Sequence, residues 1–589
     1  MLSIAAILLM IVPTVPRIGA EEVNELNVGV DFEPDVLNPF VTTSGASSEV
    51  TEKIYETLIF VRSDGTYMPW LAESWDISDD AKTYTFSLYH NITWQDGEPL
   101  TAEDVKYTFD MLVENELEPS TVRELESTEV LDDYTVRFHC KTGFVPFFMR
   151  AGETEIVPKH IWEKVDDIVM FTNNDNPIGS GPYLLDKWVK GEYWTLKVYD
   201  NYWRGRPEID KVNYILYRST DAMTLAMKAG EIDVGRIRPT QVGSYVGTPN
   251  VTITQLKTNS QYYFGYNLRR FPFSNKKFRH AMNYAIDKKE VLNSAFFGYG
   301  DVGYDGYVPP LLSYWINPDT AWEALGMTAE ERYAKAREIL DSIDFIDRDG
   351  DGIREAPDVN KCEFEMLVAS GVPTYMRTAE IIKDCLSDVG VKVDLIPKEI
   401  GALITDVYGL GEEYEPDFDS YLMDCGYILE PDYLYMEYFS NPPVIGWNGY
   451  SGGYSNSTLD EYLVKQRTTG DIAKRREHLF KCQEIIAEDL PVICLSHRIS
   501  LTAYRTDKYT GWITDEDLTS KINYLNLEVI KPIEIIKEVE VPVNVTKEVE
   551  VPVEVTKEVP VTPGWVYPTV GVFAALAIVA VIYAITRKR

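Results

Sequence analysis

The sequence predicts a mixed α/β fold with more than one lobe, followed by an extended stalk and a membrane-spanning helix. The chain has 589 residues, which is enough to bury more than one hydrophobic core. Short aromatic and β-branched runs alternate with amphipathic helical patterns along most of its length. The last part differs, because a proline-containing repeat and a long apolar run there have no partner for a packed core.

Composition excludes several classes of function. The 93 acidic and 56 basic side chains give a net charge of −37, which argues against a nucleic-acid partner. The six cysteines show no CxxC pair and no zinc spacing. In an exported protein Cys362 and Cys385, or Cys482 and Cys494, could form disulfides, and buried free thiols are the alternative.

The N-terminus has the pattern of a secretory signal. An apolar run from Ser3 to Val12 is followed by small residues that end at Ala20, before the acidic Glu21. We therefore expect a signal peptide over residues 1–20 and an extracytoplasmic protein. A buried N-terminal strand is the alternative, because the run is too short to span a bilayer.

The first strands and helices follow from local patterns. We expect a strand at Leu26–Val30, a helix at Ser48–Leu58 and a strand at Thr83–Leu88. Thr101 and Asp104 have the spacing of a capping box, so a helix should begin there.

A stretch in the middle of the chain opens with the turn NPIGSGPY, where proline fixes φ and glycine permits unusual backbone angles. Tyr183–Trp188 and Tyr193–Tyr199 are the expected strands of a hairpin, and Val212–Arg218 is a third strand. A short helix, Asp221–Lys228, should then end at Gly230.

A later helix should begin near Ser274, with Arg279 and Lys288 on its outside. Its apolar stripe comprises Ala281, Met282, Ala285 and Ile286. An amphipathic helix at Thr378–Val389 and a last helix at Ile472–Glu488 complete the predicted globular part.

The order of GSGPY, NYWRGRP and AMKAGEIDV resembles the extracytoplasmic solute-binding proteins of peptide-type ABC importers. The preceding TWQDGEPLTAEDVKYTFDML fits the same family, and the resemblance covers about Asn27 to Leu527. It implies a two-lobed periplasmic-binding-protein-like fold of class II, large type, with an extra subdomain. It also implies hinge closure over a small ligand or peptide, delivered to ABC permease subunits with cytoplasmic ATPases.

The same resemblance implies the domain boundaries. The solute-binding domain spans residues 21–530, with lobe I at about 26–60, 177–268 and 495–530, an inserted subdomain at about 61–176, and lobe II at about 269–494. No enzyme is expected: Gly449 to Gly453 matches the letters GxSxG, but the strand and helix of a nucleophile elbow are missing. The alternative function is a surface-displayed adhesion or surface-layer protein with a binding head.

Residues 531–564 are expected to form an extended stalk. The repeat KEVEVPVNVT, KEVEVPVEVT places valine at alternate positions, while Pro542 and Pro552 remove ladder donors. Self-association through the valine face is the alternative. Residues 565–589 contain the apolar run Val566–Thr586, long enough to span a membrane, and the basic tail Arg587–Arg589, which should be cytoplasmic. The head would then lie outside the cell.

The ligand contacts are predicted from the stretch DCGYILEPDYLYMEYF. In many peptide-binding relatives an aspartate four residues before a Glu-Pro or Asp-Pro pair binds the free amine of the peptide. Tyr427 stands there instead, and Asp424 lies three residues further away. Without that charged anchor, aromatic walls from Tyr427 and Trp447, with Asn448 and Arg377 as polar contacts, would suit a peptide held by its backbone, or a sugar or other neutral solute. In the alternative, Asp424 reaches the amine and Tyr427 packs in the core.

A segment in the second lobe has the spacing of a calcium loop. Acidic residues occupy its first, third, fifth, ninth and twelfth places: Asp347, Asp349, Asp351, Glu355 and Asp358. Gly352 stands at the turn position, but Arg354 replaces the usual apolar residue. An acidic solvated turn is the alternative, and no other cofactor is expected.

Overall fold

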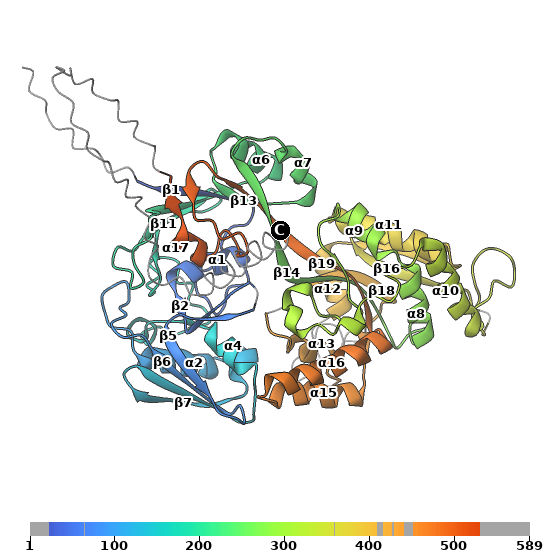
Figure 1. Ribbon diagram of the computed structural model, residues 1–589, viewed down its shortest axis with the longest axis horizontal. Helices are drawn as coiled ribbons and strands as arrows, with labels where there is room; N and C mark the ends of the chain where they lie inside the picture. The colour runs from blue at the N-terminus through green and yellow to red at the C-terminus, as the bar shows by residue number, and fades with distance from the viewer. Residues whose placement is uncertain are drawn as a thin grey trace, which may run out of the picture. The chain divides into compact units, whose positions relative to one another are not determined.

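The computed structural model (Figure 1) describes residues 23–530, apart from 64, 359, 409–415, 427–428 and 441–451. The predicted signal peptide, stalk and membrane segment lie outside these ranges. Among the helices of the described ranges, none is both long and apolar enough to span a bilayer.

A large mixed sheet of eleven strands runs through the described part of the chain. In spatial order its main path is β10 (Tyr183–Val189), β11 (Tyr193–Val198), β12 (Lys211–Leu216), β1 (Glu25–Val30), β13 (Val234–Ile237), β19 (Val492–Arg505), β14 (Val251–Tyr266), β18 (Ser420–Gly426), β16 (Glu363–Ala369) and β17 (Lys392–Lys398), and the short β15 (Asp301–Val302) also pairs with β19. β1 is parallel to both β12 and β13, and β16 is parallel to both β17 and β18. The sheet thus contains two parallel groups separated by antiparallel strands.

The long antiparallel strands β14 and β19 join these two groups (Figure 1). The register between them is irregular between Lys257 and Gln261, where a bulge bends a sheet. Before this point the strand TITQLKT alternates between half-buried and exposed residues. After it, all residues from Gln261 to Tyr266 are buried, which fits their nearly continuous aromatic sequence.

Helices around the second parallel group form one large hydrophobic core with the end of β14. They are α8 (Lys276–Ala285), α9 (Lys288–Ala295), α10 (Ala329–Ser342), α11 (Pro373–Ser387), α12 (Ile400–Tyr408), α13 (Tyr433–Tyr438), α15 (Ser457–Thr468) and α16 (Ile472–Asp489). The 3₁₀ helices η2 (Pro310–Trp315) and η3 (Pro318–Thr320) lie in the connection between α9 and α10.

The prediction that Arg279 and Lys288 lie outside this core was wrong. Both are buried, with exposed fractions of 7% and 0%. The guanidinium of Arg279 donates to backbone carbonyls, including that of Phe273 at 2.8 Å, and the Lys288 ammonium lies 2.7 Å from the carboxylate of Asp305. Each buried charge is stabilised by a partner that the local helical pattern does not reveal.

The first parallel group packs against α1 (Gly45–Ile54), α6 (Thr220–Ala229) and α17 (Lys521–Asn526), while η1 (Pro239–Gln241) and α7 (Val242–Tyr245) follow β13. The turn GSGPY contacts the backbone at the end of α1 directly. A Cβ on Gly179 would lie 1.9 Å from the carbonyl oxygen of Ile54, and the backbone N–H of Gly181 donates to the same oxygen at 2.8 Å. Glycine is required there by this close approach. The predicted end of α6 is confirmed, since Gly230 is left-handed at φ 77°.

The inserted segment forms a four-stranded antiparallel sheet in the order β5 (Ala72–Ile77), β6 (Thr83–Leu88), β8 (Thr135–Cys140), β7 (Leu125–Asp132). Its helices are α2 (Ala102–Glu114), α3 (Pro119–Val122), α4 (Phe147–Gly152) and α5 (Lys159–Trp162). The capping box of α2 is confirmed: Asp104 accepts a hydrogen bond from the backbone N–H of Thr101 at 2.9 Å.

Short two-stranded ladders complete the fold. They are β2 (Glu56–Thr57) with β9 (Glu155–Ile156), β3 (Ile59–Val61) with β4 (Tyr67–Pro69), and β20 (Tyr509–Thr510) with β21 (Glu528–Val529). The sulfurs of Cys362, Cys385, Cys482 and Cys494 are buried free thiols, so neither of the two possible disulfides forms.

Candidate ligand-binding site

A cavity of about 460 Å³ opens at the carboxyl end of β1. Its walls are the last residues of β1, the turn Asp31–Glu33, the first residues of α1, and the side chains of Glu49, Met223 and Arg236. Ligands of α/β proteins bind at the carboxyl ends of parallel strands, because the chain there leaves the sheet in loops and helix N-termini. This cavity therefore occupies the position that the topology favours for a ligand.

Charged groups of both signs line this cavity. The Glu49 carboxylate lies 3.7 Å from the Arg236 guanidinium, which also pairs with Asp517 at 2.8 Å. The Oε1 atom of Glu49 is buried and accepts no hydrogen bond from the residues that the structure describes. Burial raises the pKa of Glu49, and the nearby Arg236 opposes that rise. The pair could hold a polar or charged group of a ligand.

The turn after β1 is fixed by its neighbours. Glu33 accepts hydrogen bonds from the backbone N–H of Gly191 at 2.7 Å and from the Trp188 indole at 3.1 Å. The preceding residue, Phe32, is 69% exposed and lies in the wall of the cavity. Sequence reasoning missed this site, and an aromatic residue among the acidic residues just after a predicted strand was the available signal.

The ligand contacts predicted around the second parallel group of strands are only partly among the residues that the structure describes. Tyr427, Trp447 and Asn448 lie outside the described residues. Asp424 lies on β18, and its carboxylate accepts a hydrogen bond from the Tyr375 hydroxyl and pairs with Arg498. Arg377 lies on α11, half exposed, and pairs with Glu380 at 3.4 Å.

The Glu-Pro pair that marks the predicted amine site belongs to a buried ionic network. Glu430 pairs with Arg475, and burial raises the pKa of the Glu430 carboxyl against the opposing effect of that guanidinium. Asp432 accepts a hydrogen bond from the Gln466 amide at 2.8 Å and lies 2.9 Å from Nε of Arg467. These carboxylates are thus committed to neighbours within the protein.

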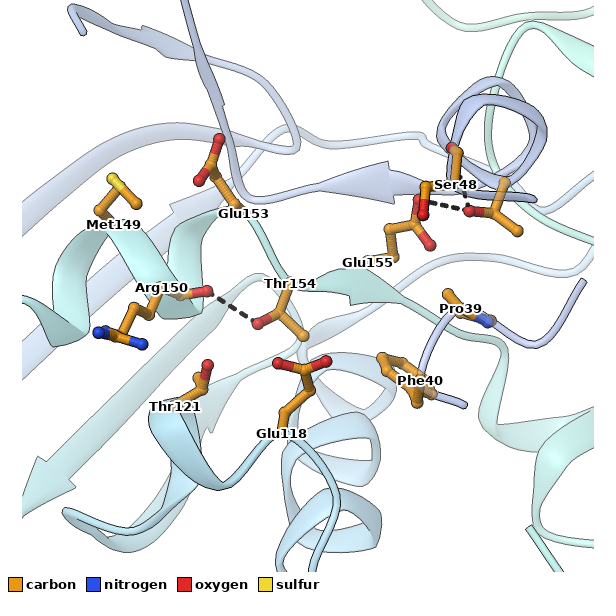
Figure 2. A pocket seen from close by; sticks show the side chains of 11 residues that line it. Pro39, Phe40, Ser48, Glu118, Thr121, Met149, Arg150, Glu153, Thr154 and Glu155 are labelled. Atoms are coloured by element: carbon orange, nitrogen blue, oxygen red, sulfur yellow. Dashed lines mark hydrogen bonds between the residues drawn. The ribbon is translucent and has the colours of Figure 1, made fainter. Parts of the chain in front are cut away.

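A second cavity, of about 250 Å³, lies between α1 and the inserted segment. Figure 2 shows the carboxylates of Glu118, Glu153 and Glu155 arranged around Thr154. Glu155 accepts a hydrogen bond from the Thr51 hydroxyl at 3.1 Å, and burial raises the pKa of Glu155 to about 8. This cavity is smaller and is not at the end of a parallel strand, so the cavity beside β1 is the better candidate.

The acidic loop between α10 and β16 differs in one residue from the calcium ligands predicted from the sequence. Carboxylate oxygens of Asp347, Asp349, Asp351 and Glu355 lie within 4.8 Å of one another. Asp358 is not part of this cluster. Its carboxylate accepts hydrogen bonds from the backbone and side chain of Asn360. The ninth place of the loop, and not the twelfth, supplies the fourth carboxylate.

A sheet whose two parallel groups are joined by a pair of long strands, with a cavity at a strand's carboxyl end, fits a two-lobed protein that binds a solute. Comparison with known sequences agrees with this class. The family "Bacterial extracellular solute-binding proteins, family 5 Middle" matches residues 66–446, and the chain belongs to this family.

Individual relatives match over most of the chain. The oligopeptide-binding protein AppA of Bacillus subtilis is 27% identical over 477 residues, which are 79% of this chain and 85% of AppA. The glutathione-binding protein GsiB of Escherichia coli is 25% identical, over 83% of this chain and 92% of GsiB. The structure of AppA in complex with a nonapeptide superposes with a TM-score of 0.68 at 26% identity, covering 86% of this chain and 99% of AppA.

A further solved structure supports the fold alone. The periplasmic oligopeptide-binding protein of Thermotoga maritima superposes with a TM-score of 0.74 at 23% identity, over 87% of this chain and all of that protein.

Proposed function

We propose that this protein binds an oligopeptide or a similarly small ligand outside the cell and delivers it to an ABC-type permease with cytoplasmic ATPases. The cavity at the carboxyl end of β1 is the observation that carries this proposal. The similarity to AppA, whose structure contains a nonapeptide, supports a peptide as the ligand.

The two lobes would close about β14 and β19. β19 pairs with β13 of the first parallel group, β14 pairs with β18 of the second, and the two strands pair with each other. The irregular register between Lys257 and Gln261 is a natural place for a bend. We therefore place the end of the first lobe in β14 near Lys257, before the boundary at 268 expected from the sequence. The return crossing lies in β19 near His497.

Delivery at a membrane requires the protein to stay near the permease. A signal peptide over residues 1–20, an extended stalk over 531–564 and a membrane helix within 565–589 would place the head at the cell surface and the C-terminus in the cytoplasm. The sequence patterns of these segments support this topology.

Ligand contacts are proposed from both lobes. In the first lobe, Arg236 and Glu49 would hold a polar group of the ligand, and Phe32 would pack on it. In the second lobe, Tyr427, Trp447, Asn448 and Arg377 remain the proposed contacts. Asp424 is a weaker candidate for an amine, because Arg498 and Tyr375 already engage its carboxylate.

Calorimetry on the full-length chain with a nonapeptide library tests this proposal. We expect micromolar or tighter binding, which Arg236→Met weakens at least about tenfold, or about 1.4 kcal/mol. Lys197→Met is the matched control, since this exposed lysine of β11 lies outside the cavity wall. If no peptide binds and none raises the melting temperature, the proposal fails and a surface-display role becomes the better interpretation.

A further inference from the structure

The loop between α10 and β16 brings acidic side chains together around a tight backbone turn. The backbone N–H groups of Gly350 and Gly352 donate to the Asp347 carboxylate at 2.7 and 3.0 Å. Both glycines are left-handed, with φ of 80° and 89°. Other residues adopt this conformation only at a cost, so the sequence DGDG specifies the turn.

The spacing of the carboxylates fits a calcium ion. Oxygens of Asp347, Asp349, Asp351 and Glu355 lie within 4.8 Å of one another. Oxygens bound to one Ca²⁺ at about 2.3–2.6 Å can be no more than about 5.2 Å apart. All four groups can therefore contact the same ion. Without a cation, four carboxylates at this separation repel one another.

Glu355 provides an independent indication of a missing partner. Its side chain is almost completely buried, with 6% of the residue exposed. The Oε2 atom accepts a hydrogen bond from the backbone N–H of Arg348 at 2.7 Å, but the buried Oε1 atom has no hydrogen-bond partner among the described residues. A buried carboxylate oxygen without a partner is costly, and a bound cation would satisfy it.

The nearby cations do not fill this role. The Arg348 guanidinium does not donate to Oε1; it donates to backbone carbonyls such as those of Asp344 and Glu355 at 3.0 and 2.8 Å. The Lys361 ammonium pairs with Asp351 and lies 3.5 Å from Asp349, on the exposed side of the cluster. Lys361 thus neutralises part of the charge and would compete with a metal ion for these two carboxylates.

We propose that Asp347, Asp349, Asp351 and Glu355 bind one Ca²⁺ ion. The donors are all hard oxygens, which suit Ca²⁺ better than transition metals. Ile353 stands at the seventh place, where a calcium loop offers its backbone carbonyl. Binding would fix the connection between α10 and β16 and so stabilise the second lobe.

Titration calorimetry with CaCl₂, on full-length chain freed of metal by a chelator, tests this site. We expect one Ca²⁺ per chain with a Kd between about 10⁻⁵ and 10⁻³ M. Glu355→Gln keeps the size of the side chain and an acceptor for Arg348, and it should weaken binding at least tenfold. Asp358→Asn neutralises an acidic residue of the same segment that lies outside the cluster, so it should leave the affinity unchanged.

Lys361→Gln adds a test with the opposite sign. Because it removes the competing ammonium, it should tighten Ca²⁺ binding several-fold, whereas Asp349→Asn should weaken it at least tenfold. Asp349 is exposed, so its substitution should not disturb folding, and the loss of Ca²⁺ affinity in Asp349→Asn is independent of the buried Glu355→Gln variant. Equal affinity for Mg²⁺, no binding at about 10 mM Ca²⁺, or unchanged binding in either Glu355→Gln or Asp349→Asn would overturn the proposal.

Discussion

The Arg150 guanidinium of α4, in the inserted segment, lies 3.4 Å from the Asp432 carboxylate just before α13 in the second lobe. The Asp432 side chain has no exposed surface. Gln466 and Arg467 are its other partners, at 2.8 and 2.9 Å. One buried carboxylate therefore holds three groups from two separate parts of the fold.

Because Asp432 has three partners and Arg150 is one of them, removing the charge of Asp432 should cost more stability than removing that of Arg150. Asp432→Asn should lower the free energy of unfolding by about 3–5 kcal/mol, because two guanidinium groups lose their buried counter-charge. Arg150→Met should cost about 1 kcal/mol, since Gln466 and Arg467 still satisfy the carboxylate. Chemical denaturation of both variants measures the difference, and equal losses would show that Arg150 is the essential partner.

Local patterns predicted much of the fold. The strand Thr83–Leu88 has the expected bounds, and the capping box at Thr101 begins α2 as expected. These features depend on neighbours within a few residues. The burial of Lys288 could not be predicted in this way, because its partner Asp305 lies in a later loop that the helical pattern does not include.

The site was harder to predict for the same reason. The cavity combines the end of β1 with Arg236 from β13 and with Thr519, so three distant segments form one wall. Their proximity depends on the order of strands in the sheet. In the acidic loop, spacing placed candidate ligands at both Glu355 and Asp358, whereas the folded turn brings only Glu355 into the cluster.

Glu155 should make stability depend on pH. Burial raises the pKa of its carboxyl from 4.5 to about 8. Between these values the unfolded chain releases the proton more readily than the folded chain, so the free energy of unfolding falls as pH rises. Glu155→Gln should therefore stabilise the protein on the order of 1 kcal/mol at pH 8, after allowance for solvent screening, and have no effect below pH about 4.5.

Thermal unfolding at both pH values checks this difference. Glu163→Gln, which neutralises an exposed carboxylate at the end of α5, is the matched control and should show no such dependence. A gain that is equal at the two pH values would mean that the Glu155 carboxyl is not the titrating group.

The globular part of the chain that ends at Ile530, the head, should fold and bind its ligand without the C-terminal segments. The last described strand, β21, pairs with β20, and the described chain ends at Ile530. Truncation before Ile533 should release a soluble protein with the same ligand affinity and melting temperature as the full chain. A misfolded fragment, or one that has lost ligand binding, would show that the repeat contributes to the head.

The last prediction concerns recognition of the peptide amine. A buried carboxylate that faces an ammonium group contributes several kcal/mol to discrimination, because removing the ammonium leaves the carboxylate unpaired. Tyr427 stands at the place where the sequence resemblance led us to expect this aspartate, and the Asp424 carboxylate is engaged by Arg498 and Tyr375.

Acetylation of the N-terminus of a peptide ligand should therefore change affinity less than tenfold, or below about 1.4 kcal/mol. Calorimetry with matched free and acetylated peptides measures this ratio, and an oligosaccharide panel tests for a neutral solute. Asp424→Asn should leave the ratio unchanged, because it alters a carboxylate that the protein itself already pairs. A loss well beyond tenfold on acetylation, abolished by Asp424→Asn, would instead assign Asp424 as the amine-binding residue and require Arg498 to move away when the ligand binds.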